Sequence, residues 1–289
     1  MKHSITKNFK AYVLVTLVLL LIGIGSMIAQ GFNLGIDFEG GNIIDVSFEH
    51  PITVAEVRTV MEKHDLSNSI IQLDITDDAS SSKGVIIRTG IIDDTTRQSI
   101  LNDLQNTIGN YDVNRIEQVG ATVGSELVRQ AVIAIAISWL LMIIYITVRF
   151  ELRFAIAAIL ALMIDVLMVI SWFAFFHLEI DSSFVAALLT VIGFSVNGTI
   201  VLYDRIRENL KSHRPNESLT ELVDNSIMQC LTRTLYTNFM VLFTVASIMI
   251  FGGETIRNFA FAMFVGFSSG LYTSIFLAGP MWKILKEKY

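Results

Sequence analysis

Six long apolar runs, separated by polar stretches, dominate the hydropathy pattern of the chain. An α-helix rises 1.5 Å per residue, so about 20 apolar residues cross the roughly 30 Å hydrocarbon core of a bilayer. Each run is long enough for one crossing, and the pattern predicts six transmembrane helices. Their expected ranges are 11–29, 130–148, 154–176, 183–203, 233–251 and 259–284.

The polar region between the first two runs, residues 30–128, has a different pattern. Helical spacing predicts two helices, one that starts after Thr53 with a Thr53–Glu56 capping box and one over 93–108. The order strand, helix, strand, strand, helix, strand predicts an α+β ferredoxin-like (βαββαβ) domain. The expected strands, which all show alternating apolar residues, are 42–48, 69–75, 84–89 and 113–119, with a polar turn at 77–83 between the second and third.

Composition supports an α-helical polytopic membrane protein, because 53% of the residues are hydrophobic and only 17% are charged. Cys230 is the single cysteine, so an internal disulfide is excluded, and no Cys/His cluster has the spacing of a structural metal site. We expect no cofactor, no metal and no nucleic-acid partner. A short helix at the membrane interface is expected near 219–227, ahead of the fifth run.

Positive charge is unevenly distributed between the segments that join the runs. Thirteen Lys and Arg residues fall on one side of the predicted membrane, and only Arg257 falls in the short loops on the other side. The positive-inside rule therefore predicts that residues 1–10 and 285–289 are cytoplasmic and that 30–128 is extracytoplasmic. Residues 31–128 hold sixteen acidic and six basic residues. Their acidic surface is either simply solvated, or it repels anionic lipid headgroups or receives a basic segment of a passing chain.

The fourth run is interrupted by small and polar residues at its middle. Thr190, Gly193, Asn197 and Asp204 recur at helical spacing and share one face, which should contact other protein rather than lipid. In the last run Gly266 and Gly270, four residues apart, predict a face for close helix packing.

The stretch GFSVNGTIVLYDRIREN, residues 193–209, resembles the fourth transmembrane segment of the SecF family, with its usual pattern G-Y-S-x-N-D-T-x-V-x-x-D-R-I-R-E-N. One position departs from the pattern, because Gly198 stands where the family usually has Asp. The segments GATVGSEL, SIMQCLTRTLYTNF and IFGGETIRNFAFAMFVGFSSGLYTSIF are similar to further family patterns. An outer-domain G-x-D-F-x-G-G segment is similar as well, and its residues here are Gly35, Asp37, Phe38, Gly40 and Gly41.

The resemblance implies a SecF subunit of the bacterial SecD–SecF accessory complex, which belongs to the resistance-nodulation-division superfamily. Such a subunit is a multi-pass protein of the bacterial cytoplasmic (inner) membrane and couples proton-motive force to movement of its outer domain. It assists protein export and catalyses no covalent reaction. The implied partners are a SecD-like subunit, the Sec protein-conducting channel, unfolded exported polypeptides and membrane lipid. Whether the coupling ion is a proton or sodium is left open.

The polar residues inside the predicted membrane are candidates for a proton relay or a polar network. Asp165 lies about 18 Å along its helix from Arg153, near the midplane, where a carboxylate is costly unless it is paired. It is either a proton carrier or part of a buried hydrogen bond to Asn197 or Thr199. If Gly198 removes the family's usual carboxylate, a proton taken up by this subunit has to use Asp165, or the path runs through the partner.

Asp204 and Arg233 allow two interpretations each. Asp204 is either part of the relay or a paired charge at the membrane interface beside Arg205 and Arg207. Arg233 stands at the expected start of the fifth helix, where an arginine can reach the interface. In the family the arginine of this R-T pair is associated with proton-coupled function. Asn197 has no titratable group, which favours a role in helix packing.

Two other functions remain as alternatives. A proton-driven exporter of lipids or small molecules normally repeats the six-helix unit and carries larger outer domains, and this chain has one of each. An intramembrane aspartyl protease would use Asp165 and Asp204, but the G-x-G-D context of such sites is absent, because Leu-Met-Ile precedes Asp165.

Overall fold

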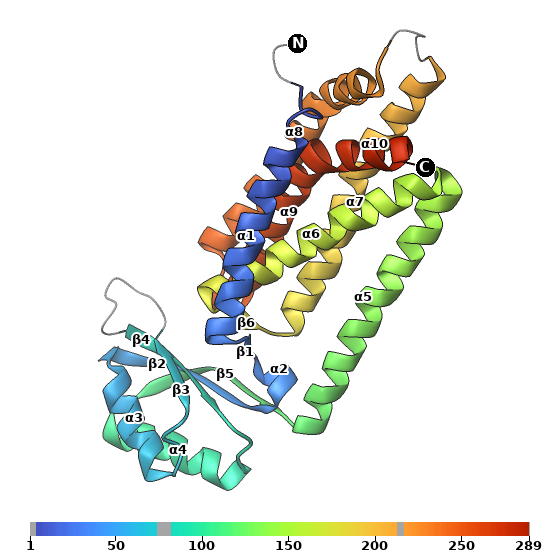
Figure 1. Cartoon of the computed structure of the whole chain (residues 1–289). Helices are drawn as coiled ribbons and strands as arrows, with labels where there is room; N and C mark the ends of the chain where they lie inside the picture. The colour runs from blue at the N-terminus through green and yellow to red at the C-terminus, as the bar shows by residue number, and fades with distance from the viewer. Residues whose placement is uncertain (1–3, 74–81, 213–216, 289) are drawn as a thin grey trace. The chain divides into compact units, whose positions relative to one another are not determined.

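The computed structural model describes residues 4–73, 82–212 and 217–288, and the chain divides into two compact units. The first, a helical unit, contains residues up to 33 and from 132 onward. The second, an α/β unit, contains residues 34–131. Most of the turn expected at 77–83 lies outside the described residues. The elements of both units are labelled in Figure 1.

Six helical spans within the described residues are long and apolar enough to cross a membrane. The last span is built from two α-helices joined by the π-helical segment η1 (Ser274–Ala278). Helices α5 and α7 end, and α6 and α8 begin, on the same side of this unit. We call that side the basic end, after Arg149, Arg153, Arg205 and Arg207. The long helices are α1 (Phe9–Gln30), α5 (Ala121–Arg149), α6 (Leu152–Phe176), α7 (Ser182–Lys211), α8 (Leu219–Phe251), α9 (Glu254–Thr273) and α10 (Gly279–Lys288).

Two helices differ from the predicted pattern at the basic end. The expected interface helix and fifth run form one continuous helix, α8, because a Ser218–Glu221 capping box starts it and no glycine or proline interrupts it before Gly252. The prediction of a separate helix near 219–227 was wrong. Helix α7 likewise continues to Lys211, well beyond residue 203, since hydrophobicity marks the membrane boundary and not the end of the helix.

The last span changes its hydrogen-bond register near its middle. Pro280, in the first turn of α10, has no N–H to donate and its ring crowds the carbonyl four residues earlier. The preceding residues adopt the wider π register, which is the usual form of such a bulge inside an α-helix. The span therefore continues through the proline.

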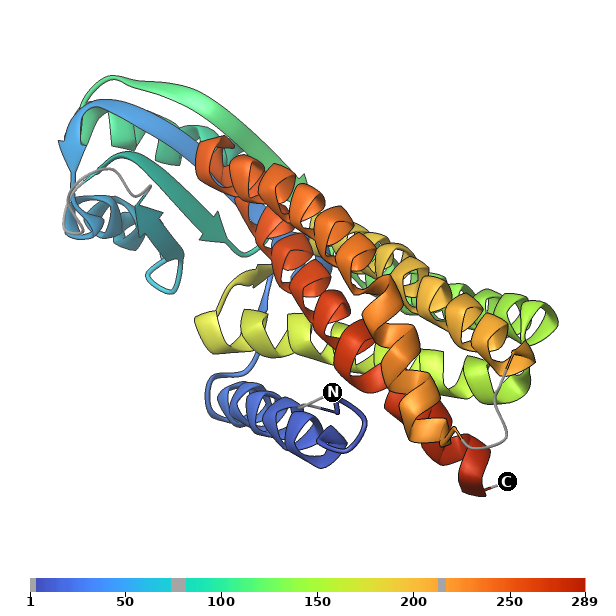
Figure 2. The ribbon, with the colours of Figure 1, turned by 90° about the horizontal axis from the view of Figure 1, so that it is seen from above.

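Helices α6, α7 and α9 form the centre of the helical unit, and α1 lies beside α6 (Figure 2). Within this chain, 61% of the apolar window of α6 is buried, whereas only 6% of that of α5 is buried. Helix α5 therefore needs lipid or another protein around it. Where α9 approaches α7, a Cβ at Gly266 would stand 2.2 Å from Val191 Cγ2 and one at Gly270 would stand 2.9 Å from Ser195 Oγ. A Cβ at Gly193 would meet nothing within 4 Å, so Gly193 packs against no described residue.

The α/β unit contains one antiparallel sheet of strand order β3-β4-β2-β5. Its elements follow the predicted order from β2 to β5. Strand β1 (Asn33–Leu34) precedes them, and β6 (Glu179–Ile180) belongs to the helical unit. The elements of the unit are α2 (Ile36–Glu39), β2 (Gly41–Ile52), α3 (Val54–Lys63), β3 (Ile70–Leu73), β4 (Ser82–Thr89), α4 (Asp94–Thr107) and β5 (Tyr111–Val119).

Apolar side chains between the sheet and helices α3 and α4 form the core of this unit, with Ile44, Val57 and Ile100 fully buried. The predicted capping box is confirmed: Glu56 Oε2 accepts the Thr53 N–H at 2.7 Å. This bond and the Thr53 hydroxyl lower the pKa of Glu56. The glycine-rich segment forms a short helix, α2, directly before β2 begins at Gly41.

Gly41 and Gly124 both allow close backbone approaches within the α/β unit, and Gly124 brings two separate motifs of the resemblance together. Gly41 has φ 142°, and a Cβ there would stand 2.4 Å from the Thr89 carbonyl oxygen. A Cβ at Gly124, in the GATVGSEL segment, would stand 2.7 Å from the Phe38 carbonyl oxygen. The first turns of α5 therefore pack directly on the backbone of α2, which only glycine allows.

A methyl group at Gly266 should separate α9 from α7. Overpacking of this kind typically costs about 1–3 kcal/mol, so we expect Gly266→Ala to lower the thermal stability of the purified protein in detergent. Gly193→Ala is the matched control, because its Cβ meets nothing within 4 Å and it should leave the melting temperature unchanged. Adding Val191→Ala to the Gly266→Ala variant should restore its thermal stability. Equal melting of Gly266→Ala and the parent would contradict the close packing.

Candidate functional site

Asp165 on α6 is the one carboxylate that the structure buries completely among the described residues, with no exposed surface. It lies 13 residues after Leu152 and 11 before Phe176, near the middle of its helix. No ion pair to a described residue neutralises it. Its environment therefore has to stabilise either a charge or a proton without a basic partner.

Three hydroxyl groups from two other helices surround this carboxyl group. Ser195 Oγ on α7 lies 2.5 Å from Oδ2, and Ser269 Oγ on α9 lies 2.7 Å from Oδ1. Thr273 Oγ1, one turn after Ser269, lies 2.9 Å from Oδ1 and 3.1 Å from Oδ2. We call Ser195, Ser269 and Thr273 the hydroxyl cage.

The hydroxyl cage can support both protonation states of Asp165. A charged residue at the centre of a membrane helix costs about 2.5–3.5 kcal/mol on insertion scales. A hydrogen bond to a charged group contributes about 1.5–3 kcal/mol, so three of them are enough to offset that cost. A hydroxyl group donates one hydrogen bond and accepts others, so the cage can also accept a hydrogen bond from the O–H of a protonated Asp165.

One of the two interpretations of Asp165 was a buried hydrogen bond to Asn197 or Thr199, but among the described residues its hydrogen-bond partners are those of the hydroxyl cage. Thr199 is buried, but its hydroxyl has no partner among the described residues. Asn197 is exposed and makes no hydrogen bond to them. The sequence did contain a signal for the true partners, since Ser269 and Thr273 are four residues apart and flank Gly270. Gly270 leaves room for the Ser195 hydroxyl, because a Cβ there would lie 2.9 Å from it.

A polar cavity of about 60 Å³ lies beside Gly198, between α7, α8 and α9. A Cβ at Gly198 would make only an ordinary contact, 3.6 Å from Ser274 Oγ. Asn197, Arg233 and Asn238 are among the residues that line the cavity. A water needs roughly 10–15 Å³ of such volume, so the space left by the missing side chain can hold several waters or a carboxyl group.

Arg233 is fourteen residues inside α8 and does not stand at a helix start, which corrects the prediction. Its side chain lines the cavity beside Gly198, is exposed, and has no hydrogen bond or ion pair to any described residue. An arginine in this position is available to a group outside the chain.

Asp204 forms an ion pair with Arg149 at 3.4 Å, and the side chains of both residues are about half exposed. The expected neighbours Arg205 and Arg207 bond elsewhere, to Glu208 and to the Arg149 carbonyl. Asp204 lies nine residues beyond Ser195 on α7, about 13 Å along the helix from the cage. This separation excludes an aspartyl dyad with Asp165.

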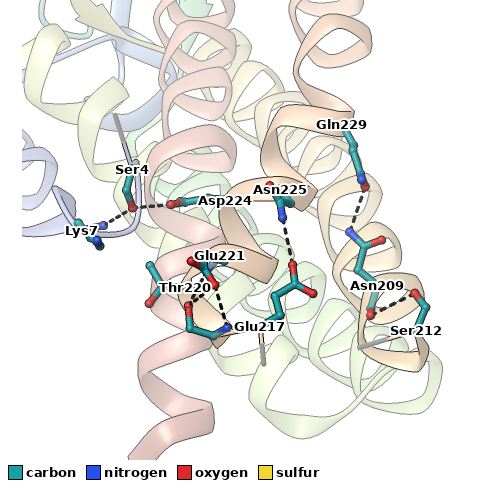
Figure 3. Close-up of a pocket in the computed structure, with 11 residues that line it drawn as sticks. Ser4, Lys7, Asn209, Ser212, Glu217, Thr220, Glu221, Asp224, Asn225 and Gln229 are labelled. Atoms are coloured by element: carbon teal, nitrogen blue, oxygen red, sulfur yellow. Dashed lines mark hydrogen bonds between the residues drawn. The ribbon is translucent and has the colours of Figure 1, made fainter. Parts of the chain in front are cut away.

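A second buried carboxylate contact lies at the basic end, and no sequence pattern had pointed to it. Asp224 Oδ1 accepts the Thr6 N–H at 2.9 Å and the Thr6 hydroxyl at 2.7 Å, and its other oxygen accepts Ser4 Oγ. Asp224 is 7% exposed. Ser4 and Asp224 line a polar pocket of about 940 Å³, and Figure 3 shows the hydrogen bond between their side chains. These bonds hold the residues before α1 against α8.

No group of three His, Cys, Asp or Glu residues in the described part of the chain could hold a metal ion. The six spans and the caged carboxylate instead define a multi-pass membrane protein with a polar centre. The sequence pattern described as "Protein export membrane protein SecD/SecF, C-terminal" matches residues 99–288, and the "SecD/SecF GG Motif" matches residues 25–52.

The chain belongs to the SecD/SecF family, and within it to the SecF subunits. It is 59% identical to the protein translocase subunit SecF of Acidaminococcus fermentans over 99% of this chain and 98% of that protein. It is 34% identical to the protein translocase subunit SecDF of Bacillus subtilis, over 99% of this chain and 38% of that protein. The crystal structure of SecDF from Thermus thermophilus, a translocon-associated membrane protein, matches with a TM-score of 0.88 at 31% identity, over 99% of this chain and 39% of that chain.

Replacing Asp224 should release the residues before α1. Hydrogen bonds to a charged group contribute about 1.5–3 kcal/mol each, so we expect Asp224→Ala to accelerate amide hydrogen exchange at Thr6 by tenfold or more, on the order of 1.4 kcal/mol. Asn225→Ala is the matched control, because the Asn225 amide donates to Glu217 and not to this segment. Unchanged exchange at Thr6 in Asp224→Ala would contradict the contact.

Proposed function

We propose that the chain is a SecF-type subunit of the Sec translocase that assists protein export by coupling proton-motive force to movement of its α/β unit. The observation that carries the proposal is the fully buried Asp165 carboxyl group in its hydroxyl cage. A single titratable group with partners that both donate and accept hydrogen bonds is suited to taking up and releasing a proton.

A SecD-like subunit is the partner that we propose for the helical unit. The single-chain SecDF relatives support it, since this chain matches 38–39% of their length. The polar face of α7 supports it as well, because Thr190, Gly193, Asn197 and Asp204 are all exposed in this chain. Polar groups in a bilayer need protein or water around them. Arg233 beside the cavity would then face an acidic group of the partner, which compensates for Gly198.

The α/β unit would be the extracytoplasmic part that acts on exported, unfolded polypeptides near the protein-conducting channel. We propose a ferredoxin-like fold for it, supported by the element order from β2 to β5 and by the antiparallel order β3-β4-β2-β5. The basic end would then face the cytoplasm of a bacterial cell, with both chain ends there. The Lys and Arg residues of that end support this orientation, namely Arg149, Arg153, Arg205, Arg207 and Lys211.

Cysteine labelling tests the orientation. In a Cys230→Ser background, Ala55→Cys on the exposed surface of α3 should react with an impermeant maleimide in cells whose outer barrier is permeable. Lys211→Cys at the basic end is the control and should react only after lysis. The reverse pattern would invert the proposed topology.

Replacing Asp165 tests the coupling. Asp165→Asn keeps the shape and an acceptor oxygen but removes the titratable group. We expect the variant to assemble with its partner normally, while export that depends on proton-motive force falls to the level of cells without the subunit. Asp204→Asn is the matched control, because an exposed ion pair contributes only about 0–1 kcal/mol and its loss should leave export intact.

Gly198→Asp extends this test, because its side chain would enter the cavity that Arg233 lines. We expect it to restore part of the export lost in Asp165→Asn. If Asp165→Asn alone exports like the parent, this subunit is a scaffold and the ion path belongs to the partner.

A further inference from the structure

An apolar groove of about 540 Å³ runs between α1, α6 and α9 on the outside of the helical unit. Trp172 and Phe176 of α6 line it, together with Phe261 and Phe264 of α9. The rings of Trp172 and Phe176 are stacked at 5.6 Å, and those of Phe176 and Phe261 meet edge to face at 5.7 Å. The groove therefore has walls that are fixed by aromatic packing, and it is separate from the polar cavity beside Gly198.

The few polar atoms that border the groove already have hydrogen-bond partners. The hydroxyl of Ser268 donates to the Phe264 carbonyl at 2.7 Å, and that of Ser269 donates to Asp165. The hydroxyl of Tyr272 donates to the Tyr12 carbonyl at 2.8 Å. The three hydroxyl donors at the groove are therefore engaged, and apart from the Trp172 indole the rest of its lining is apolar, so the groove is complementary mainly to a hydrocarbon group.

The groove is as long as one leaflet and is closed at its inner end. From Phe261 to Tyr272 the helix rises about 16 Å, close to half of a roughly 30 Å hydrocarbon core. At the end nearer the basic end, the Tyr272–Tyr12 hydrogen bond joins the last span to α1, and the Tyr12 and Phe276 rings lie 4.6 Å apart. A chain in the groove has to enter from the opposite leaflet and stop there.

These dimensions favour a lipid chain over a helix of another protein. A helix 16 Å long and 10 Å wide occupies on the order of 1,200 Å³, more than twice the volume of the groove. A transmembrane helix would also have to cross the Tyr12–Tyr272 contact, because it spans both leaflets. A single acyl chain fills one leaflet and needs no polar partner.

We propose that this groove binds one acyl chain of a lipid from the leaflet opposite the basic end. The proposal rests on the helices spanning a membrane and not on the proposed role in export. Ser269 borders the groove and also belongs to the hydroxyl cage. The bound chain therefore covers the part of the cage that Ser269 presents to the groove.

Photocrosslinking tests the proposal with a phosphatidylethanolamine that carries a diazirine in its acyl chain. The protein is reconstituted with and without its SecD-like partner, irradiated and mapped by mass spectrometry. We expect adducts to concentrate on residues 168–176 and 261–272 in both preparations. Adducts spread over the helices in proportion to exposed surface, or lost when the partner is present, would overturn the proposal.

Filling the groove provides the matched variants. Val265→Trp should abolish these adducts, whereas Val132→Trp on the exposed α5 should leave them unchanged. Ser268→Leu is a smaller filling variant that keeps the cage intact, because the Ser268 hydroxyl bonds only to its own helix. If either folded filling variant keeps the adducts, the groove is not the binding site. Crosslinking does not measure export, so a failure of this proposal can be distinguished from a failure of the proposed function.

Discussion

A carboxyl group enclosed by three helices determines how closely those helices have to pack. The hydroxyl groups of the cage reach Asp165 at 2.5–3.1 Å only because α9 lies against α7 at Gly266 and Gly270. A side chain at Gly270 would displace Ser195, which is itself a cage residue. The close packing of α9 on α7 and the hydrogen bonding of Asp165 therefore depend on each other, and a change in either disturbs the other.

The same arrangement leaves much of the surface of the helical unit uncovered by the described chain. The centre around α6 is well buried, but only 6% of the apolar window of α5 is buried, and the residues of the polar face of α7 are exposed. Lipid chains can cover the apolar surface of α5, whereas they cannot form hydrogen bonds with the side chains of Asn197 or Arg233. The unit has the properties of half of a membrane domain, as expected for a relative of longer single-chain SecDF proteins.

The sequence predicted the spans well because the thickness of a bilayer sets the length of each apolar run. It predicted the ends of α7 and α8 poorly, since helices continue past the membrane boundary until a cap or a glycine stops them. Residue counting placed Asp165 near mid-helix correctly. The spacing of Ser269 and Thr273 placed them on one face of their helix beside Gly270, but it could not show that this face turns toward Asp165, because contacts between helices depend on how each is rotated about its axis. Asp224 was missed for the same reason, since its partners are 218 and 220 residues away.

The π segment at Ser274–Ala278 gives the last span two independent faces. It holds one residue more than an α-helical turn would, and each residue turns a helix by about 100°. The part before the segment directs Ser269 and Thr273 toward Asp165, and the part after it directs the buried Trp282 onto the Phe154 ring, stacked at 4.8 Å. A deletion of one residue inside Ser274–Ala278 can be absorbed only by rotating one face away from its contacts. The surplus residue is thus what allows a single helix to serve both the polar centre and the aromatic cluster near the basic end.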